Sequence, residues 1–310
     1  MGRIKVSSAW VWAVVAMLLG GWLWLDLRRP VMEPGEAPKV GAALGIRTED
    51  VTGVTCRAAA RSLSLARTGD RWRLTEPINA PADGDAVKAL LEELLEQPTE
   101  MLIEKPTNLA RYGLVAHDGE ATLTARGRTV TLRLGGPDPG KGAVYAQEAG
   151  SGRLLLLPSA AAASVRTKAA ADLRSRKMVE ADVEQVTGLS VSTPKLKWSV
   201  RRTGEEWLYS VPRAGEKADR FTVDDILFDT VASATGVAAE PPADAGRFGL
   251  LRPEIRVVVT LKDGKTGWLE IGGKATGGGR FARGSAGGGA VFVIPAETIK
   301  RLSKDPGTSK

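Results

Sequence analysis

The sequence predicts an α+β protein that consists of two tandem copies of one unit behind a single N-terminal transmembrane helix. Three observations support this prediction: an internal repeat, an alternation of apolar and polar residues that is typical of β-strands, and a long uncharged N-terminal run. In each unit we expect a mostly antiparallel β-sheet with one amphipathic helix packed against it. The expected parts are a membrane anchor at 1–29, a proline-rich tether at 30–43, the first unit at 44–178, the second unit at 179–305 and a disordered tail at 306–310.

The N-terminal run covers residues 6–25, VSSAWVWAVVAMLLGGWLWL, and contains no charged residue. As a helix it would span about 30 Å, which is one bilayer core. Tryptophans lie near both of its ends, as in the aromatic belts of membrane helices. A cleaved signal peptide is the alternative, but the run is long for one and no small-x-small cleavage site follows it. Arg3 and Lys5 precede the run, and Asp26, Arg28 and Arg29 follow it. Because the free N-terminal amine adds to the positive charge before the run, we expect a single-pass inner-membrane protein whose C-terminal region is extracytoplasmic, in the periplasm.

The internal repeat appears when residues 49–77 are aligned with residues 184–212. The tripeptide Val-Thr-Gly at 51–53 returns at 186–188, and later landmarks keep their order with small differences in spacing. Such a repeat decides the architecture, and we expect its shared positions to serve turns and packing. The paired positions are Trp72 and Trp207, Pro77 and Pro212, Tyr112 and Phe248, Gly113 and Gly249, Leu114 and Leu250, Gly135 and Gly272, and Gly136 and Gly273.

Each unit is expected to begin with a hairpin and to continue with further strands after a helix. In the first unit the hairpin turns at Gly69 and Asp70, and the same pattern recurs around Gly204. Alternating or continuously apolar runs predict the later strands. These runs are 120–127, 129–136, 143–149 and 153–158 in the first unit, and 254–264, 266–273, 280–285 and 290–295 in the second.

The helix of each unit is predicted from apolar residues at helical spacing. The stripe is Val87, Leu90, Leu91, Leu94 and Leu95 in the first unit, and Val223, Ile226, Leu227 and Val231 in the second. Asp83 or Asp85 can cap the first helix. Thr222 followed by Asp225 predicts a capping box for the second. An alanine-rich helix at about 159–176 is expected to close the first unit.

The repeated aromatic-Gly-Leu motif has a structural and a functional interpretation. Gly113 and Gly249 are expected to adopt a backbone conformation that a Cβ atom would penalise. The aromatic residue and the leucine beside each glycine are then expected to cover the sheet or the helix. The alternative is that Tyr112 and Phe248 form an aromatic platform for a ligand.

No catalytic, cofactor-binding or metal-binding residues are predicted. The segment GGPDPGKG at 135–142 resembles a phosphate-binding loop, but Gly142 stands where the magnesium-binding hydroxyl belongs and a strand follows. His117, the only histidine, is expected in a solvated loop, and Cys56, the only cysteine, in a strand. The net charge of +7 is scattered along the chain, which indicates no nucleic-acid site. We therefore expect a protein that is not an enzyme.

The shared motifs resemble a known bacterial family. They are W-x-L-x-x-P, Ala-Asp before an amphipathic helix, Tyr/Phe-Gly-Leu, Leu/Ile-Gly-Gly and an aromatic-Ala strand, and they cover about residues 44–305. This composite is similar to the family of domain of unknown function 4340 (DUF4340). The resemblance implies an N-terminal membrane anchor and an association with ABC-type transporter subunits, including those of gliding-motility type. It implies no catalytic residues.

These observations lead to one expected function and two alternatives. The leading expectation is an accessory interaction subunit of an ABC-type transport complex in the bacterial envelope, with a protein partner and no cofactor. The first alternative is a periplasmic module that binds a cell-envelope polymer or another ligand, for which Trp198 or Trp268 would be exposed. A hydrolase is the less favoured alternative, because fold alone does not exclude chemistry.

Overall fold

The computed structural model describes residues 37–59, 61–103, 106–232 and 234–307. The chain divides into residues 1–38 and a compact unit of residues 39–310. The anchor predicted at 1–29 therefore lies outside the described residues. Where the structure is described, no helix is long and apolar enough to cross a membrane. The predicted α+β class is confirmed, since the described part contains two antiparallel sheets and several helices.

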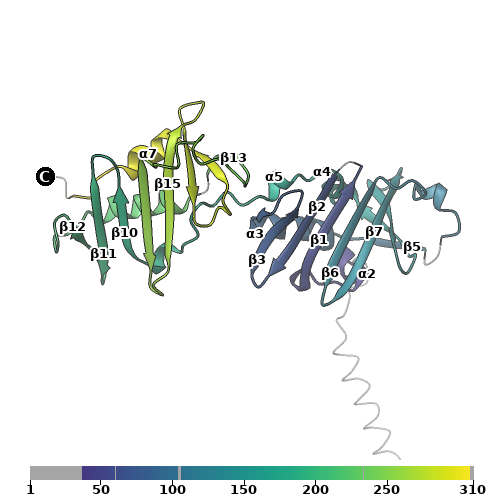
Figure 1. The fold of residues 1–310 in the computed structure, drawn as a ribbon. Helices are drawn as coiled ribbons and strands as arrows, with labels where there is room; N and C mark the ends of the chain where they lie inside the picture. Colours follow the sequence, from purple (N-terminus) through teal and green to yellow (C-terminus); the bar gives the residue numbers. More distant parts are fainter. Residues whose placement is uncertain (1–36, 60, 104–105, 233, 308–310) are drawn as a thin grey trace, which may run out of the picture. The chain divides into compact units, whose positions relative to one another are not determined.

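The first sheet has nine strands in the order β4-β3-β2-β1-β6-β7-β8-β9-β5, and every neighbouring pair is antiparallel (Figure 1). Its strands are β1 (Val51–Ala58), β2 (Arg61–Thr68), β3 (Arg71–Glu76), β4 (Ala80–Pro81), β5 (Glu100–Ile103), β6 (Gly119–Ala125), β7 (Arg128–Asp138), β8 (Ala143–Glu148) and β9 (Leu154–Pro158). The strands that follow the helix thus add to one side of β1, and the N-terminal hairpin adds to the other.

The second sheet has eight strands in the order β12-β11-β10-β14-β15-β16-β17-β13. Its strands are β10 (Val186–Ser192), β11 (Lys197–Thr203), β12 (Glu206–Val211), β13 (Gly236–Ala239), β14 (Ile255–Leu261), β15 (Thr266–Lys274), β16 (Arg280–Gly284) and β17 (Val291–Ile294). From β12 to β13 this order matches that of the first sheet from β3 to β5, strand for strand. The internal repeat of the sequence is therefore a repeat of sheet topology.

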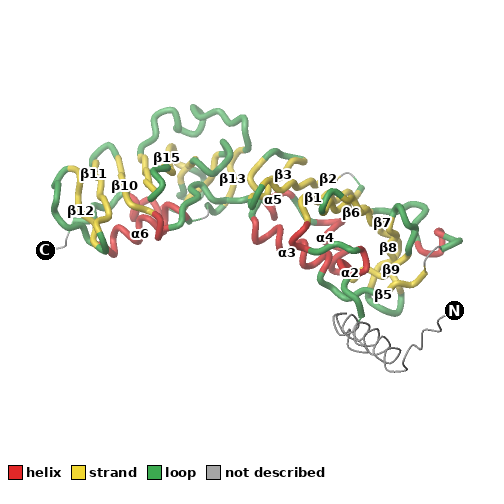
Figure 2. Tube along the Cα trace, turned by 90° about the horizontal axis from the view of Figure 1, so that it is seen from below, coloured by secondary structure: helices red, strands yellow, loops and turns green. Residues whose placement is uncertain are grey.

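The helices cover one face of each sheet (Figure 2). They are α2 (Val40–Leu44), α3 (Gly84–Leu95), α4 (Ser159–Thr167) and α5 (Ala170–Leu173) in the first repeat, and α6 (Arg220–Val231) and α7 (Ala296–Leu302) in the second. Three short 3-10 helices are η1 (Thr48–Asp50), η2 (Leu109–Tyr112) and η3 (Val183–Gln185).

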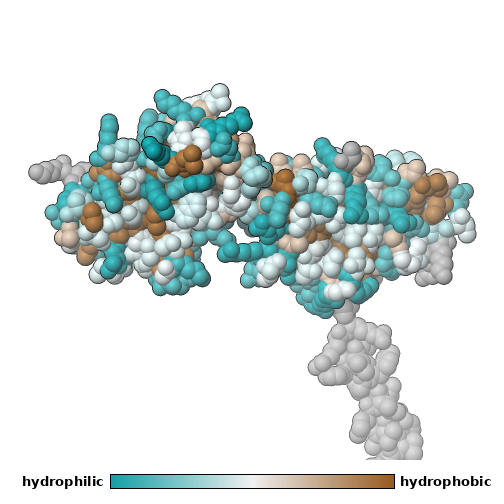
Figure 3. Space-filling view, viewed as in Figure 1, coloured by the Kyte–Doolittle hydropathy of each residue, from teal (hydrophilic) through white to brown (hydrophobic). Residues whose placement is uncertain are grey.

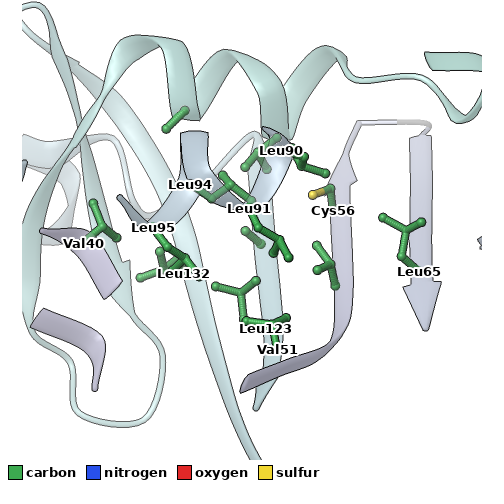
Figure 4. Close-up of a cluster of buried hydrophobic side chains, with 14 of the residues drawn as sticks. Val40, Val51, Cys56, Leu65, Leu90, Leu91, Leu94, Leu95, Leu123 and Leu132 are labelled. Carbon is green, nitrogen blue, oxygen red and sulfur yellow. The ribbon is translucent and has the colours of Figure 1, made fainter. Parts of the chain in front are cut away.

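The predicted apolar stripe of α3 faces the sheet and forms the centre of the first core. All five residues of the stripe are buried, and Figure 4 shows Leu90, Leu91 and Leu94 gathered with Cys56 and Leu123 between helix and sheet. In the second repeat Val223, Ile226 and Leu227 are fully buried in the corresponding core. Burying such side chains contributes about 1.5–3 kcal/mol each, so these two cores hold the repeats together.

The repeated Val-Thr-Gly tripeptide is a β-bulge at the same place in both sheets. Val51 pairs with Ala125 and Gly53 with Thr124, so Thr52 is the extra residue of β1. The pairing of β10 with β14 shifts in the same way between Val186 and Gly188. A bulge bends its strand and increases the local twist, which explains why this short motif recurs.

Two helix predictions are corrected by the structure. The capping box at Thr222 is wrong: Asp219 is the N-cap of α6, and its carboxylate accepts from the backbone N–H and the hydroxyl of Thr222. In the first repeat Asp83 caps α3, as one of the two predicted alternatives. The helix expected at 159–176 is two helices, since α4 ends at Thr167 and α5 begins at Ala170.

The structure also moves three expected boundaries. Val40 is fully buried and its N–H donates to the carbonyl of Gln97, so the fold begins before residue 44. Met178, which we expected in the first unit, packs in the second core. Pro306 is buried and its carbonyl accepts from the N–H of Asp219, so residues 306 and 307 belong to the second repeat and not to a disordered tail.

Candidate functional site

The aromatic-Gly-Leu and Gly-Gly motifs of the first repeat touch each other. Gly113 ends η2 with φ of +68°, a left-handed conformation. A Cβ atom penalises this conformation, as we predicted for the backbone at Gly113. A Cβ atom on Gly113 would lie 2.6 Å from the backbone nitrogen of Gly136, and one on Gly135 would overlap the carbonyl oxygen of Tyr112. Glycine at these places lets two backbone segments approach more closely than any other residue would allow.

The second repeat forms the same contact. Gly249 has φ of +70°, and a Cβ atom there would lie 2.7 Å from the backbone nitrogen of Gly273. The N–H of Gly273 donates to the carbonyl of Phe248 at 2.8 Å, and a Cβ on Gly272 would lie 2.5 Å from that same oxygen. The two motifs recur together in the sequence because they form one contact in space.

An arginine satisfies the first glycine's carbonyl in each Gly-Gly pair. The carbonyl of Gly135 accepts from Nη2 of Arg166 at 2.9 Å, and that of Gly272 from Nε of Arg280 at 2.8 Å. Arg166 lies in α4 and Arg280 in β16, so the two donors come from different elements. Both repeats need a donor at this carbonyl, because a buried carbonyl without a hydrogen-bond partner lowers the stability of the fold.

The aromatic residue of each motif packs on a second ring. Tyr112 and Tyr145 have ring centroids 5.0 Å apart at 67°, and Phe248 and Phe281 are 4.9 Å apart at 70°. Both are edge-to-face pairs, the arrangement that aromatic rings prefer. Tyr145 also donates to the Asp138 carboxylate at 2.8 Å, and this hydrogen bond raises the pKa of the phenol. The aromatic side chain of each motif therefore packs against a ring of the strand β8 or β16.

The residue after each motif is an exposed aliphatic. Leu114 and Leu250 are 5% and 0% exposed, whereas the next residues, Val115 and Leu251, are 73% and 75% exposed. These two side chains are called the repeat tips below. Most of the surface in view is hydrophilic or weakly apolar, with small brown patches (Figure 3). A solvent-exposed aliphatic at the same place in both repeats is not explained by the packing of either core.

The remaining paired positions lie in the hairpin, away from the glycine contact. Trp72 and Trp207 are 9% and 2% exposed. An arginine from the preceding strand lies over each ring, Arg67 at 5.8 Å and Arg202 at 5.9 Å from the ring centroid. The peptide bonds that precede Pro77 and Pro212 are both cis. The paired residues thus form two groups in each repeat. The tryptophan and the proline lie at the hairpin, and the aromatic-Gly-Leu and Gly-Gly motifs form the glycine contact.

Arg174 joins the end of the first repeat to the second and has no counterpart in the repeat. Its side chain is 2% exposed. Its guanidinium donates to the carboxylate of Glu240 at 2.9 Å, to the carbonyl of Gly287 at 2.9 Å and to that of Ser175 at 2.6 Å. The planar fork of arginine can satisfy several acceptors at once. Arg174 forms an isolated β-bridge with Ala82, and the equivalent Ala218 of the second repeat forms one with Gly307. A glycine therefore stands in the second repeat where the first has Arg174.

The side chains that could carry chemistry lie apart from these contacts. His117 is exposed in the loop before β6, as predicted. Cys56 is buried in β1, and burial raises the pKa of its thiol to about 12. Residues 135–142 form the end of β7 and the turn that leads into β8, so the strand expected after this segment is present. Within the described ranges, no group of three or more His, Cys, Asp or Glu could hold a metal ion.

Trp198 does not lie where the polymer-binding alternative requires it. It is fully buried, and its indole N–H donates to the carbonyl of Lys304 at 3.1 Å. Trp268 is half-buried, with Arg283 at 6.0 Å from its ring centroid. Trp198 therefore does not supply the exposed ring that would favour the polymer-binding alternative, since β11 turns this side chain into the second core.

Sequence reasoning missed three features of the surface and the junction: the repeat tips, Arg174 and two exposed phenylalanines, Phe221 and Phe228. The phenylalanines of α6 are 80% and 70% exposed. A signal for them was present, because both lie outside the predicted apolar stripe of that helix. The tips could have been found by extending each aromatic-Gly-Leu motif by one residue. No sequence pattern marks Arg174, since its partners are distant in the chain.

Comparison with known proteins gives one family. No curated protein and no solved structure matches this chain. The model of one protein family, described as a domain of unknown function (DUF4340), matches residues 72–235. That range runs from the paired Trp72 through the first glycine contact and into the second repeat, where it ends shortly after α6. The chain belongs to the family of domain of unknown function 4340.

Proposed function

We propose that this chain is a non-enzymatic, membrane-anchored extracytoplasmic protein that serves as an accessory interaction subunit of an ABC-type transport complex in the bacterial envelope. In this proposal the run at 6–25 anchors the protein in the inner membrane and the two repeats lie in the periplasm. The uncharged length of that run and its tryptophan-rich ends support the anchor. The family resemblance supports the choice of a transporter as the partner.

The observation that carries an interaction function is the pair of repeat tips. Val115 and Leu251 expose an aliphatic side chain at equivalent places, directly after a contact that fixes the backbone through Gly113 or Gly249. A rigid loop that presents an apolar side chain loses little conformational entropy on binding. Two copies on one chain can also bind together with an increased effective concentration.

The proposal is tested with the double variant Val115→Asp and Leu251→Asp in the full chain. We expect the variant to lose the transporter subunits that co-purify with the wild-type protein in mild detergent, because a carboxylate cannot be buried unpaired in an apolar contact. Both side chains are at least 73% exposed, so the unfolding temperature should not change.

The matched control introduces a charge into the same loop without touching a tip. His117→Asp lies two residues beyond Val115 and is exposed. It should retain the same subunits as the wild-type protein. Equal retention by the double variant and the wild type would contradict a binding role for the tips.

A further inference from the structure

The face of the second sheet that the helices leave uncovered has a hollow over β10, β11, β12 and β14 (Figure 2). Alternation along β11 turns Trp198 and Val200 into the core. Lys197, Ser199 and Arg201 therefore lie on the uncovered face. The hollow has a volume of about 330 Å³, at the lower end of the range for ligand pockets, about 300–1,000 Å³. Its lining includes Arg201 but no aspartate or glutamate.

Several hydroxyl groups at this hollow have no partner in the described part of the chain. The hydroxyls of Ser199, Ser210 and Thr260 form no hydrogen bond with another described residue. Ser190, which pairs with Ser199 across the strands, donates over a long 3.5 Å to a backbone carbonyl. Val211 pairs with Ser199 from the other side and is 46% exposed. Free hydroxyls beside an exposed aliphatic side chain complement the hydroxyls and C–H groups of a sugar ring.

The first repeat has the same row of positions, but its polar groups bond to one another. The hairpins of the two repeats align, so Ser64 corresponds to Ser199 and Glu76 to Val211. The hydroxyl of Ser64 lies 3.2 Å from that of Thr55 and donates to the carboxylate of Glu76 at 3.2 Å. The scaffold therefore does not require the free hydroxyls that the second repeat presents.

The charges beside this row also differ between the repeats. Ser62 of the first repeat corresponds to Lys197, and Ala66 corresponds to Arg201. Lys197 and Arg201 are exposed, and neither forms an ion pair with a residue that the structure describes. At these positions and at that of Glu76, the second repeat therefore loses one carboxylate and gains two cations.

The other charged positions of the same face do not cancel this change. Ser192 stands in the place of Arg57, which removes one cation. Glu270 lies between Arg256 at 3.3 Å and Arg283 at 2.8 Å, so two arginines share one carboxylate. The balance of the face remains positive, and a surface of this kind attracts anions.

We propose that this hollow binds a phosphorylated sugar unit. The phosphoryl group would accept from the guanidinium of Arg201, because arginine binds phosphate through two parallel N–H bonds. The sugar hydroxyls would bond to the free hydroxyls of Ser199, Ser210 and Thr260, and a C–H face of the ring would lie on Val211. The inference goes beyond the transporter proposal and depends neither on it nor on the repeat tips.

The test is equilibrium dialysis of the full chain in mild detergent with radiolabelled glucose that is phosphorylated on its anomeric oxygen. We expect saturable binding at one site per chain. Unlabelled glucose and inorganic phosphate should each compete at least about tenfold more weakly than the unlabelled sugar phosphate, because each makes only part of the contacts. Arg201→Ala should weaken binding at least about tenfold.

The first repeat supplies the matched variants. Arg201→Ala introduces the residue found at position 66, and the unfolding temperature should not change because Arg201 is exposed. Val211→Glu introduces the carboxylate found at position 76, and it should weaken binding by repelling the phosphoryl group. Arg252→Ala removes an exposed arginine that does not line the hollow, and it should bind as the wild type does.

Several outcomes would overturn the proposal. These are the absence of saturable binding, an unchanged affinity in Arg201→Ala, and an equal loss in Arg252→Ala. Competition by inorganic phosphate as strong as by the sugar phosphate would show an anion contact without sugar recognition. Displacement of the sugar phosphate by phosphatidylglycerol vesicles, but not by the free sugar phosphate, would show that a lipid surface occupies this face.

Discussion

At the scale of single residues, Gly113 and Gly249 hold the contact that links the two recurring motifs. Each combines a positive φ with a neighbouring backbone that leaves no room for a Cβ atom. Gly69 has φ of +59° in a hairpin turn, but nothing lies within 4 Å of its Cβ position. This difference allows the cost of the backbone conformation to be separated from the cost of the close approach.

We predict that Gly113→Ala and Gly249→Ala each destabilise the protein more than Gly69→Ala does. The left-handed conformation should cost all three variants about 1 kcal/mol in the free energy of unfolding. The overlap with the neighbouring backbone should cost the first two a further ~1–3 kcal/mol. Urea denaturation of the three variants measures this. Equal losses in all three would show that the contact with Gly136 or Gly273 does not matter for stability.

The conformation of these glycines could be predicted from the sequence, but their partner could not. A duplicated glycine after an aromatic residue indicates a turn that excludes a Cβ atom. The approach of Gly113 to Gly135 and Gly136 depends on where β7 lies in the sheet, which no local pattern records. Arg174 was missed for the same reason, since its partners Glu240 and Gly287 lie 66 and 113 residues away along the chain.

At the scale of elements, Asp219 is the N-cap of α6 and satisfies a backbone donor of its first turn. Its carboxylate accepts from the hydroxyl of Thr222 at 2.6 Å and from the N–H of the same residue at 2.9 Å. The hydrogen bond from the Thr222 hydroxyl lowers the pKa of the Asp219 carboxyl group most, and the hydrogen bond from the Thr222 N–H lowers it further. The ionised group therefore stabilises the folded state at neutral pH. This contribution is lost as the pH falls below about 3.9 and through the lower pKa of the folded state.

We predict that Asp219→Ala lowers the free energy of unfolding by about 1 kcal/mol at pH 7, and that the gap from the wild type narrows in acid. Denaturation at a series of pH values tests this. Asp225→Ala, a change of an exposed carboxylate on the same helix, should have little effect at any pH. An Asp219→Ala deficit that is as large at pH 3 as at pH 7 would contradict the role of the ionised cap.

Most elements could be predicted, because apolar periodicity reports directly on burial. The stripe of α3 and the strands β6, β7, β8 and β9 lie where the pattern places them, whereas β5, which directly follows α3, was not predicted. The cap of α6 was misplaced because Thr222 and Asp225 match the sequence pattern of a capping box. In the structure the helix begins earlier, and the carboxylate of Asp219 accepts from the N–H of Thr222. The helix Val40–Leu44 was missed because its apolar residues follow a proline-rich segment and are too few to show a period.

At the scale of the whole molecule, residues 39–310 form one compact unit although they contain two repeats. Arg174 contributes to this, since it bonds to Glu240 and Gly287 of the second repeat. Removing this side chain would leave the carbonyls of Ser175 and Gly287, and the 27% exposed carboxylate of Glu240, without the hydrogen bonds that it donates. The junction is therefore expected to be sensitive to this one side chain.

We predict that Arg174→Ala destabilises the protein by about 3 kcal/mol, and that Arg174→Lys does not restore the loss. An ammonium group cannot reach the separate acceptors that the planar guanidinium satisfies. Thermal unfolding measures both variants. Arg176→Ala, an exposed arginine two residues on, serves as the control and should behave as the wild type does. Full rescue by lysine would show that charge alone, and not the hydrogen-bonding fork, holds the junction.

The central claim is that the two repeats are a docking device for a membrane protein complex. The most direct measurement is purification of the full-length chain from its native membrane in mild detergent, with mass spectrometry of the proteins that remain bound. The control is residues 1–38, the part outside the compact unit, fused to an unrelated soluble domain. We expect ABC-type transporter subunits to be retained by the full chain and lost from the control. A full-length protein that emerges without partners, or a control that retains the same subunits, would contradict the account.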